Sequence, residues 1–392
     1  MKIRRYIKKD KEDYIRMCEY CYTMPREDAE HYITQAEKYC RGFVAEEEGS
    51  VLSAMFYHPF KQNIRHVNYP MAGLAGVVTM PEARNRGLVR EQVRVIQKDM
   101  IAQGYITSCL QPFKPVFYQN FGFANASRRL RCIFYVEDIA KSDLVFEFIR
   151  IDEPSIELFQ PIAKTFADTH NGATYRANEF WEGEIFHQWK HEKSKFYYLI
   201  RHEDRNVAYV IFLYLPTKEE FGPDMKVVDY GFINHIGATG LFQFFRPHRD
   251  QIKNVIINVP ENFDIYHFVP ANLHKIKMHS WMMFKVINPL KAMLQYPAPK
   301  DLSFEFELQL SDPLYGNEVS SYAFHVHDGI IESVNHSNNL LKTSIVSFSR
   351  MFIGRNSIHQ LIEYGEAEIS ENIIKNIDLL FPREIVFIKD VF

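Results

Sequence analysis

The chain has 392 residues, too many for a single compact core, so its length predicts two or three domains. Apolar residues make up 46% and charged residues 24%, a composition that excludes disordered, collagen-like and low-complexity chains. Lys and Arg number 46 against 49 Asp and Glu, and the resulting net charge of -3 argues against a general nucleic-acid-binding protein.

Neither the apolar stretches nor the N-terminus predicts contact with a membrane. The longest mostly apolar stretches, 72–80 and 207–215, have nine residues each, whereas a membrane-spanning helix needs about 20. Lys2, Arg4 and Arg5 open the chain without a following hydrophobic signal region, so a cleaved secretion signal is not expected. An odd number of cysteines in a long chain is typical of reduced thiols and favours a cytoplasmic protein. The five are Cys18, Cys21, Cys40, Cys109 and Cys132.

The first third of the chain predicts a mixed α/β domain. An apolar segment rich in Gly and Val, 72–80, is followed by a basic turn and a helix over 88–103. Apolar residues recur in that helix at helical spacing from Val89 to Met100, and Gly104 is a typical helix stop. The other expected elements are strands over 2–6, 105–110 and 132–136, a hairpin over 43–58, and helices over 11–21, 26–40 and 114–121.

A second α/β block runs from about residue 143 to 290. Its central part predicts a strand over 226–236, a glycine turn at 237–240, a helix over 241–253 and a strand over 256–259. This order repeats that of the segment 72–110, although the residues themselves do not repeat. The glycine turn carries no arginine, so we expect no second cofactor site there. The remaining elements are helices over 155–170 and 178–191 and strands over 196–201 and 207–215.

The last hundred residues change character after Pro297 and Pro299. Residues 304–310 alternate strictly between apolar and polar side chains, which is typical of a half-buried strand. A His-Asp-Gly turn that ends at Gly329 predicts a hairpin. The hairpin strands are expected over 321–326 and 330–334, and helices over 344–352, 357–364 and 372–381. This part therefore predicts a small α+β domain.

The most informative segment is the basic turn 81–90, which reads Pro-Glu-Ala-Arg-Asn-Arg-Gly-Leu-Val-Arg. The first amides of a helix lack intrahelical partners and carry the positive end of the helix dipole, so such a turn can hold a diphosphate. Gly87 permits close approach of the backbone, and Arg84, Arg86 and Arg90 add positive charge. A basic surface turn that only caps a helix is the alternative for this segment by itself.

A second motif follows one strand later, where residues 117–123 read Phe-Tyr-Gln-Asn-Phe-Gly-Phe. The two motifs together resemble the GNAT superfamily of acyl-CoA transferases, in which an Arg-x-x-Gly-x-(Gly/Ala) loop precedes a helix with a Tyr before Gly-Phe. Val89 departs from this pattern, because the superfamily prefers Gly or Ala there. The string 81–90, the lead-in Pro-Phe-Lys-Pro at 112–115 and the three-part layout are similar to one branch, the enhanced intracellular survival (Eis) N-acetyltransferases.

The resemblance covers the whole chain and implies its organisation. It implies a GNAT domain that binds acetyl-CoA over 1–140, a second, degenerate GNAT domain over 141–292, and a sterol-carrier-like domain over 293–392. The implied fold class is α/β, with tandem GNAT domains followed by an α+β domain. The resemblance also implies a homo-oligomer, specifically a hexamer, and no metal.

The residues that would bind acetyl-CoA follow from the same resemblance. Val77, Val78 and Thr79 would offer backbone groups of a splayed strand to the pantetheine arm. The diphosphate would be held by the turn residues Arg84, Asn85, Arg86, Gly87, Leu88 and Val89.

The resemblance assigns Tyr118 as the general acid that protonates the departing coenzyme A thiolate. A phenol has a pKa of about 10 and a thiol one of about 8.5, so the site must favour this transfer by position. The alternative role for Tyr118 is that of a core aromatic beside Phe117 and Phe121.

In this family the C-terminal carboxylate acts as a base, and here that group belongs to Phe392. An α-carboxylate has a pKa of about 3.5, so it would act after desolvation or through a water, and would also hold the cationic amine. Asp390 could pair with a cationic acceptor or be a solvated carboxylate. A frayed terminus is the alternative for the whole segment 385–392.

Other residues with reactive side chains are expected to be structural. The pair Cys18/Cys21 has the spacing of metal ligands but no second pair. The pair His187/His191 lies in an expected helix but lacks the Glu that follows the first His of a metalloprotease. The pair His325/His327 would share one face of a strand without an evident carboxylate partner.

The sequence therefore predicts an acetyl-CoA-dependent N-acetyltransferase that transfers the acetyl group directly to a primary amine, without a covalent acyl-enzyme. Expected acceptors are small polyamine-like or aminoglycoside-like molecules or lysines, and no nucleic acid or membrane is expected as a partner. One alternative is an acyltransferase with another acyl donor or a protein acceptor. Another is a non-catalytic carrier of an apolar ligand, which would not need Arg84, Gly87 and Tyr118.

Overall fold

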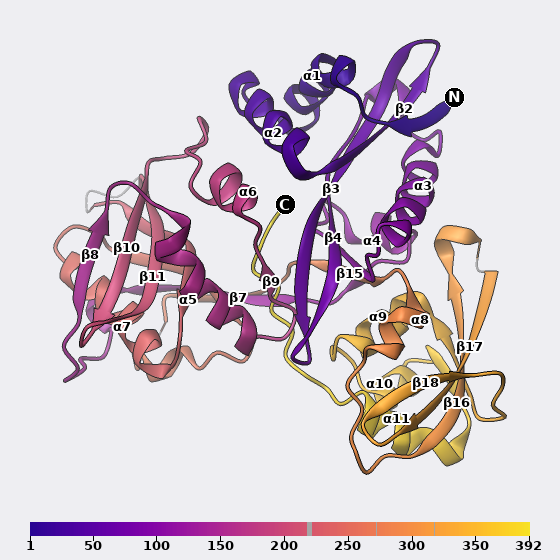
Figure 1. Cartoon of the computed structure of the whole chain (residues 1–392). Coiled ribbons are helices and arrows are strands. Elements are labelled where there is room, and N and C mark those ends of the chain that lie inside the picture. Colours follow the sequence, from indigo (N-terminus) through magenta and orange to yellow (C-terminus); the bar gives the residue numbers. More distant parts are fainter. Residues whose placement is uncertain (218–221, 272, 317) are drawn as a thin grey trace. The chain divides into compact units, whose positions relative to one another are not determined.

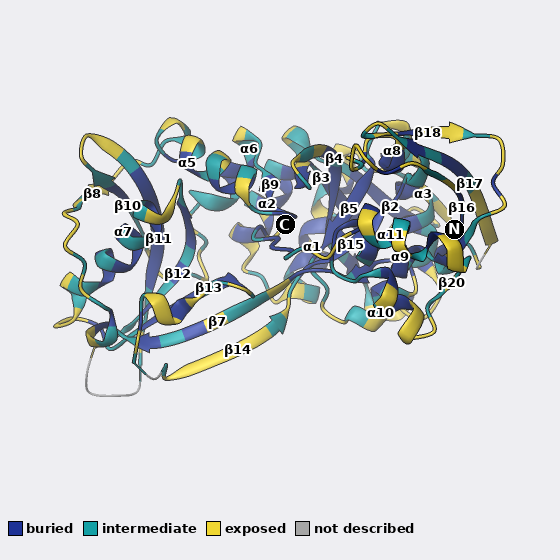
Figure 2. Cartoon of the chain, turned by 90° about the horizontal axis from the view of Figure 1, so that it is seen from below, coloured by how far each residue is buried: buried dark blue, intermediate teal, exposed yellow. Residues whose placement is uncertain are grey.

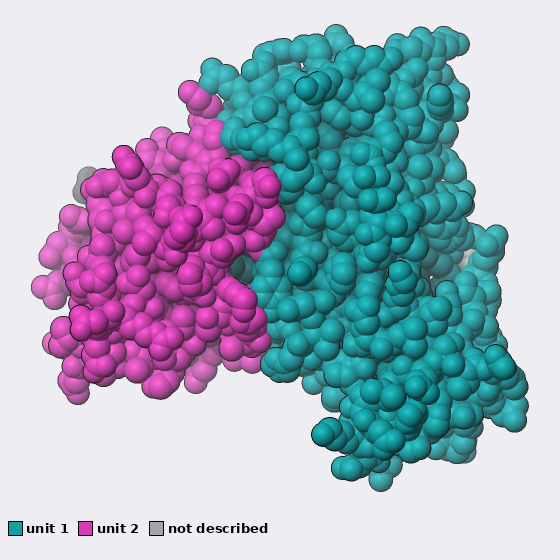
Figure 3. Space-filling model, viewed as in Figure 1, with its two compact units in different colours: residues 1–127, 171–175, 280–392 teal, residues 128–170, 176–279 magenta. Residues whose placement is uncertain are grey.

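The computed structural model describes residues 1–217, 222–271, 273–316 and 318–392, which form a mixed α/β structure with three sheets. Contacts divide the chain into two compact units (Figure 3). The first comprises residues 1–127, 171–175 and 280–392, and the second comprises 128–170 and 176–279. Each unit is thus built from segments that lie far apart in the sequence.

The first sheet lies in the first unit and has the strand order β1-β2-β3-β4-β5-β15-β6, with β9 paired to β3 (Figure 1). β4 and β5 are parallel, and the other neighbours in this order are antiparallel. The strands are β1 (Lys2–Arg5), β2 (Arg41–Glu47), β3 (Ser50–Ile64), β4 (Val67–Thr79), β5 (Thr107–Leu110), β6 (Ala124–Asn125), β9 (Thr174–Tyr175) and β15 (Met283–Val286). Figure 2 shows the central strands of this sheet as largely buried.

Helices cover both faces of this sheet. They are α1 (Lys11–Tyr22), α2 (Arg26–Tyr39), α3 (Leu88–Ala102) and α4 (Pro115–Gln119). Successive side chains of a strand point to opposite faces. Phe56 of β3 stacks on Tyr14 of α1, whereas Tyr57 shares an apolar cluster with Val93 and Ile96 of α3. α1 and α3 therefore pack on opposite faces, and α3 does so through the apolar stripe that its sequence predicts.

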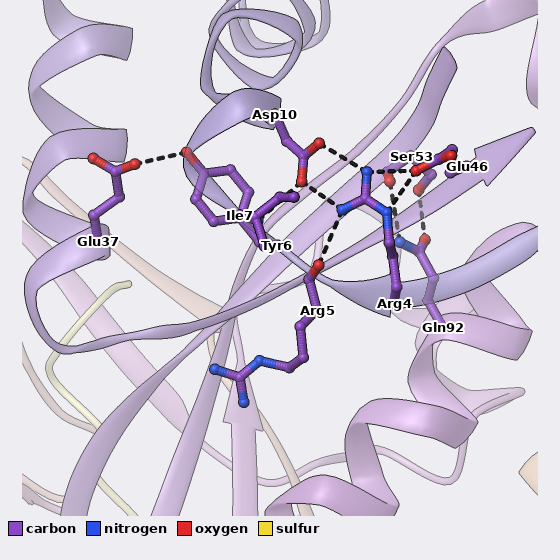
Figure 4. Close-up of polar contacts among 9 residues, drawn as sticks. All are labelled: Arg4, Arg5, Tyr6, Ile7, Asp10, Glu37, Glu46, Ser53 and Gln92. Carbon is purple, nitrogen blue, oxygen red and sulfur yellow. Dashed lines mark hydrogen bonds and ion pairs between the residues drawn. The ribbon is translucent and has the colours of Figure 1, made fainter. Parts of the chain in front are cut away.

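An ion-pair cluster fixes the start of α1 against the edge of the sheet (Figure 4). Arg4 in β1 binds both carboxylate oxygens of Asp10, at 2.7 and 2.8 Å, and also binds Glu46 in β2. Burial by itself raises a carboxyl pKa, but the Arg4 hydrogen bonds hold the pKa of Asp10 below its usual value. Asp10 is the residue directly before α1, so the cluster determines where this helix leaves the sheet.

β15 joins the first sheet from a distant part of the sequence. It lies between β5 and β6, with Met283 paired to Leu110 on one side and to Asn125 on the other. Its four residues, Met283–Val286, are all buried. The sequence pattern does not predict a strand here, because four residues carry too little periodicity to indicate one.

The second unit contains a sheet with the order β14-β7-β13-β12-β11-β10-β8. Its strands are β7 (Arg128–Tyr135), β8 (Glu147–Ile151), β10 (Lys195–His202), β11 (Arg205–Leu215), β12 (Asp224–Phe232), β13 (Asn254–Pro260) and β14 (Lys275–Ser280), and its helices are α5 (Ile156–Thr169), α6 (Asn178–Phe180) and α7 (His235–Phe245). The strand expected over 132–136 overlaps β7, which pairs with β13. An apolar cluster around Phe159, Trp181 and Tyr209 forms the core on the α5 side.

The glycine turn expected at 237–240 was wrong, because these residues lie inside α7. Asn234 starts this helix by accepting a hydrogen bond from the Gly237 amide at 3.0 Å. A Cβ on Gly237 would lie 2.2 Å from the carbonyl oxygen of Val207. Glycine is needed there for close packing of the helix on β11, and not for a turn.

The C-terminal part of the first unit contains a sheet with the order β18-β17-β16-β19-β20. Its strands are β16 (Phe304–Asp312), β17 (Glu318–His327), β18 (Ile330–Val334), β19 (Leu340–Ser344) and β20 (Ala367–Ile369), and its helices are α8 (Pro289–Leu294), α9 (Ile345–Phe352), α10 (Ile358–Glu363) and α11 (Ile374–Leu380). The hairpin expected around Gly329 is confirmed as β17–β18. No helix in the described part of the chain is long and apolar enough to cross a membrane.

Candidate functional site

The parallel strands at the centre of the first sheet separate after a short pairing. β4 and β5 pair from Met71 to Gly73, and no pairing between them follows in the described residues. From Leu74 to Thr79, β4 therefore has no strand partner on the side of β5. An extended ligand with amide groups can form hydrogen bonds to such a strand edge.

A bulge interrupts β4 within this stretch. The single residue Met55 of β3 lies opposite two residues of β4, Gly76 and Val77. Gly76 has a φ of 61°, in the left-handed region that favours glycine. A Cβ on Gly76 would also lie 2.4 Å from Tyr14 Oη. Backbone conformation and the tyrosine both require glycine at this position.

Tyrosines of α1 hold the carbonyl groups of the bulge. Tyr14 Oη donates to the Gly76 carbonyl at 2.6 Å, and Tyr22 Oη donates to the Val77 carbonyl at 2.9 Å. The shape of the bulge is therefore set by the protein itself. These roles were not predicted from the sequence. The signal that could have indicated them is the recurrence of Tyr14, Cys18 and Tyr22 every four residues along one helix face.

Hydrogen bonds from β3 fix the end of β4 against α3. Ser53 Oγ donates to the Val78 carbonyl at 2.8 Å and lies 2.9 Å from Thr79 Oγ1. Gln92 of α3 bonds the same serine through both its side-chain oxygen and its side-chain nitrogen. The carbonyls of Val77 and Val78 thus have protein partners, and each keeps a second lone pair for a ligand.

The turn before α3 leaves the first amides of the helix open. Asn85 and Gly87 both have positive φ, of 60° and 75°, which bends the chain into a compact turn. Gly87 precedes the helix, no side chain caps it, and nothing in the described structure lies within 4 Å of the position of its missing Cβ. Leu88, 2% exposed, anchors the start of the helix in the core. The uncapped amides can bind an anion.

Arg84 and Arg86 are exposed on this turn, as the sequence predicts. Arg84 Nε donates to the Thr79 carbonyl at 3.1 Å, so its guanidinium lies at the end of β4. Arg86 pairs with Glu47 at 2.6 Å. Both side chains are solvent-accessible, and a diphosphate could recruit them at small cost because exposed ion pairs are weak.

Arg90 has partners away from the turn that the sequence did not predict. Its guanidinium donates to the Pro313 carbonyl at 2.7 Å and lies over the ring of Phe121. Val89, where the superfamily prefers a smaller residue, packs with its side chain against the apolar cluster beneath the helix. The departure from the superfamily pattern therefore lies on the core side of the helix.

Tyr118 lies on the short helix α4 with its ring in the same apolar cluster as Leu74 and Val77. It is 3% exposed, and burial raises the pKa of its hydroxyl. Tyr118 is also close enough to Tyr22 for the two phenols to interact electrostatically. Its ring is thus packed as a core aromatic would be.

The C-terminal segment after α11 is packed and not frayed. Val386, Phe387 and Ile388 are at most 2% exposed. The Phe387 amide donates to the Asn171 carbonyl at 2.9 Å, and the Ile388 amide donates to Ser127 Oγ at 3.1 Å. These bonds hold an extended segment, yellow in Figure 1, along the first sheet.

The last three residues reach β3 and β4. Asp390 is 5% exposed and accepts a hydrogen bond from Thr174 Oγ1, so it is not the solvated carboxylate that the sequence left open. The ring of Phe392 lies against Gly73 and beside the rings of His58 and Phe60. Burial lowers the pKa of His58 to about 3, so this histidine is neutral beside the terminus.

The predicted site residues thus meet along one stretch of β4. Phe392 contacts Gly73, where the pairing with β5 ends. Tyr118 packs in the cluster with Leu74 and Val77, one and four residues further on. The strand then leads through Thr79 into the turn that opens α3.

The pairs expected to be structural show no ligand set. Among the described residues, no group of three or more His, Cys, Asp and Glu side chains could hold a metal ion.

The pair His187/His191 follows the helical turns that end at Ile185 and does not lie on a helix, contrary to the prediction. The rings of the pair His325/His327 lie 4.5 Å apart on one face of β17, and His327 does have a carboxylate neighbour, Glu332 at 3.3 Å, which the sequence analysis missed. Burial raises the pKa of the Cys18 thiol to about 12.

Comparison with known domain families finds matches to three parts of the chain. Two acetyltransferase (GNAT) domain families match residues 2–126 and residues 172–286, and a sterol carrier protein domain family matches residues 290–389. These matches confirm the predicted fold class of tandem GNAT domains followed by a sterol-carrier-like domain. The expected boundaries at residues 140 and 292 stay predictions.

Solved structures with the same fold cover the whole chain. A GCN5-related N-acetyltransferase from Anabaena variabilis is 20% identical with a TM-score of 0.87, and 100% of each chain is covered. A probable N-acyltransferase from Enterococcus faecalis is 16% identical with a TM-score of 0.89, covering 100% of this chain and 99% of the other. Eis1 from Mycobacterium abscessus is 15% identical with a TM-score of 0.80, and 100% of each chain is covered. The comparison with curated proteins found no match.

Proposed function

Because the chain belongs to the GNAT superfamily of acyltransferases, with the three-part fold of the Eis-like N-acetyltransferases, we propose that it transfers an acetyl group from acetyl-CoA to a primary amine. One observation carries this proposal. The edge of β4 that faces away from β3 is open from Leu74 to Thr79. Phe392 contacts Gly73, directly before this stretch, and the stretch leads at its other end into the uncapped turn before α3.

In this proposal, the donor binds along β4 through backbone groups of Val77, Val78 and Thr79. Its diphosphate lies on the amides of residues 85–89, where the helix dipole and Arg84 stabilise the negative charge. Arg86 gives up its ion pair with Glu47 and pairs with the phosphate instead. The open space around Gly87 supports this role, because the backbone can approach the diphosphate closely there.

The proposed transfer is direct and needs two proton movements. The amine nitrogen attacks the thioester carbonyl carbon, the C–N bond forms, and the C–S bond then breaks. The leaving sulfur takes a proton from Tyr118 Oη, and the nitrogen loses a proton to the Phe392 carboxylate, directly or through a water. Burial raises the pKa of Tyr118, but the same apolar surroundings raise the pKa of the leaving thiol, so the transfer remains feasible.

The acceptor in this proposal is a small amine, such as a polyamine-like or aminoglycoside-like molecule, or a lysine side chain. The cationic form of such an amine is held by the terminal carboxylate and loses one proton to solvent before its nitrogen attacks, which is separate from the proton that the carboxylate accepts during the transfer. A cytoplasmic location remains a prediction from the cysteine content and a homo-hexamer one from the resemblance, and light scattering on the purified protein would measure the oligomer.

The proposal is tested by release of free thiol from acyl-CoA esters in the presence of an amine panel. We expect acetyl-CoA to be used with at least one polyamine or aminoglycoside, and the release to depend on the amine. Octanoyl-CoA and myristoyl-CoA serve as competing donors. Faster turnover of the long-chain donors would favour the alternative acyltransferase, and thiol release that no amine increases would contradict N-acetyl transfer.

A further inference from the structure

Lys285 is a buried lysine at the centre of the first unit that the mechanism above does not use. It lies in β15 and is 0% exposed. Burying an ammonium group is costly unless its charge and all of its N–H groups are satisfied. Desolvation lowers the pKa of Lys285, and the neighbouring carboxylate of Asp312 opposes this shift.

Three acceptors surround the ammonium group and come from three different segments. Lys285 Nζ lies 2.8 Å from the carbonyl oxygen of Phe121, 2.8 Å from Gln97 Oε1 and 2.8 Å from Asp312 Oδ2. An ammonium group has three donors, so this set saturates it. Phe121 follows α4, Gln97 lies in α3, and Asp312 ends β16 in the sterol-carrier-like part.

The bond to Phe121 connects Lys285 to the turn that carries Tyr118. The amides of Phe121 and Phe123 both donate to the Tyr118 carbonyl, at 2.9 and 3.2 Å. The ring of Tyr118 packs edge to face against the rings of the same two phenylalanines. A shift of the Phe121 carbonyl would therefore move both the backbone and the ring contacts of Tyr118.

Gly122 allows Lys285 to approach this turn. A Cβ on Gly122 would lie 2.7 Å from Lys285 Nζ and 2.9 Å from Asp312 Oδ1. Gly122 also has a φ of 85°, which other residues rarely adopt. The turn after α4 is thus shaped around the lysine and its carboxylate partner.

The segment that begins with Asp312 also contacts α3. Arg90 donates to the Pro313 carbonyl and Arg94 donates to the Leu314 carbonyl at 2.8 Å. α3 begins with the turn proposed to hold the diphosphate. The same three residues of the sterol-carrier-like part, 312–314, therefore contact α3 directly and the Tyr118 turn through Lys285.

We propose that Lys285 and Asp312 form a positioning pair. The pair fixes the position of the Tyr118 hydroxyl relative to α3 for the transfer step. The pair contacts no substrate and acts through the Phe121 carbonyl. This inference rests on the proposed function, because it requires Tyr118 to be the general acid. Through Asp312, the sterol-carrier-like part would thus take part in a reaction at Tyr118, which lies far from it in the sequence.

The first test is Lys285→Met, which keeps a long unbranched side chain and removes the charge. Misplacement of a catalytic group by about 1 Å can reduce the rate by about 100-fold, so we expect kcat to fall on the order of 10–100-fold. The KM for acetyl-CoA should stay within about 3-fold, because the diphosphate turn does not depend on the lysine. Arg94→Gln is the matched control, since it removes another contact between α3 and the 312–314 segment without touching Lys285, and its kcat should stay within about 3-fold.

The second test combines Lys285→Met with Tyr118→Phe. If the lysine acts through the tyrosine hydroxyl, the double variant should be no more than about 3-fold slower than Tyr118→Phe alone. Losses that multiply, or a parallel rise in KM and fall in kcat, would overturn the positioning role and leave the proposed function intact. A kcat near wild type in Tyr118→Phe would instead refute the general acid and the inference with it.

Asp312→Asn covers the case in which Lys285→Met does not fold. The amide keeps an acceptor oxygen and removes the compensating charge. We expect a smaller fall in kcat in the same direction and the same dependence on Tyr118. An unchanged kcat in a folded Asp312→Asn, with a melting temperature that shows the pair has been weakened, would also overturn the inference.

Discussion

The ring of Phe392 lies so close to Gly73 that a Cβ on Gly73 would come within 2.7 Å of it. Gly73 is the last residue of β4 that pairs with β5, so the Phe392 side chain marks the point where the two strands separate. The ring of Phe60 completes the contact at 5.0 Å between centroids. Glycine at position 73 is therefore what allows the Phe392 ring to lie on the face of β4 just before its open edge begins.

The first prediction concerns this contact. In Gly73→Ala the new methyl group must displace the ring of Phe392, because the backbone of a central strand cannot move by an ångström without losing its pairing. We expect kcat for acetyl transfer to fall at least about 10-fold, with the affinity for coenzyme A within about 3-fold. Steady-state kinetics and calorimetry measure the two quantities.

A deletion variant provides the control for Gly73→Ala. Without Phe392, the alanine methyl group has room, so Gly73→Ala should no longer lower the melting temperature of the protein. If Gly73→Ala destabilises the deletion variant as much as the full chain, the methyl group clashes with something other than the terminal ring.

The second prediction concerns Gly87. A non-glycine residue at a φ of 75° costs about 1–2 kcal/mol, although the described structure leaves space for a side chain there. Gly87→Val should therefore destabilise the protein modestly and weaken coenzyme A binding more strongly, by blocking the approach of the diphosphate. Unchanged affinity in calorimetry would remove residues 85–89 from the cofactor site.

The third prediction separates two arginines of the same turn. Arg84 lies exposed at the end of β4, whereas Arg90 is bound to Pro313. Arg84→Ala should weaken coenzyme A binding several-fold and reduce its salt dependence, because one charge contact to the phosphates is lost. Arg90→Ala should leave the affinity for coenzyme A unchanged. If both variants lost affinity equally, the net positive charge near the turn, and not the position of Arg84, would determine binding.

The fourth prediction concerns Tyr118. Tyr118→Phe keeps the buried ring and should lower kcat on the order of 10²–10⁴-fold, with little change in melting temperature. Burial raises the pKa of the hydroxyl above its ordinary value of about 10, so the acid form persists through neutral and mildly alkaline pH. We therefore expect no falling limb from Tyr118 in the pH profile of kcat below about pH 10. A limb near pH 8 that disappears in Tyr118→Phe would contradict this environment.

Local patterns predicted the elements whose residues interact with their sequence neighbours. The apolar stripe beginning at Val89 indicated a helix over 88–103, which the structure shows as α3, Leu88–Ala102. The alternation over 304–310 indicated a strand, which is β16, Phe304–Asp312. In both cases the side-chain period itself determines which face is buried, so the pattern carries the information.

Contacts between distant residues were not predictable in this way. Nothing near Met283 indicates that it pairs with Leu110 and Asn125, because the partners are chosen by the assembled sheet. Asp390 and Thr174 are likewise more than two hundred residues apart. Of the candidate site, the turn and Tyr118 came from motifs and Phe392 from resemblance, whereas Tyr14, Tyr22 and Lys285 emerged only from the folded chain.

The most direct test of the account compares two otherwise identical proteins, one tagged at the N-terminus and one at the C-terminus. A C-terminal tag turns the Phe392 carboxylate into a neutral amide and places new atoms beside Gly73. We predict that the C-terminally tagged protein binds coenzyme A as the other does but shows no amine-dependent thiol release. Equal acetyl-transfer rates of the two proteins would contradict the account, because the terminal carboxylate would then take no part in the reaction.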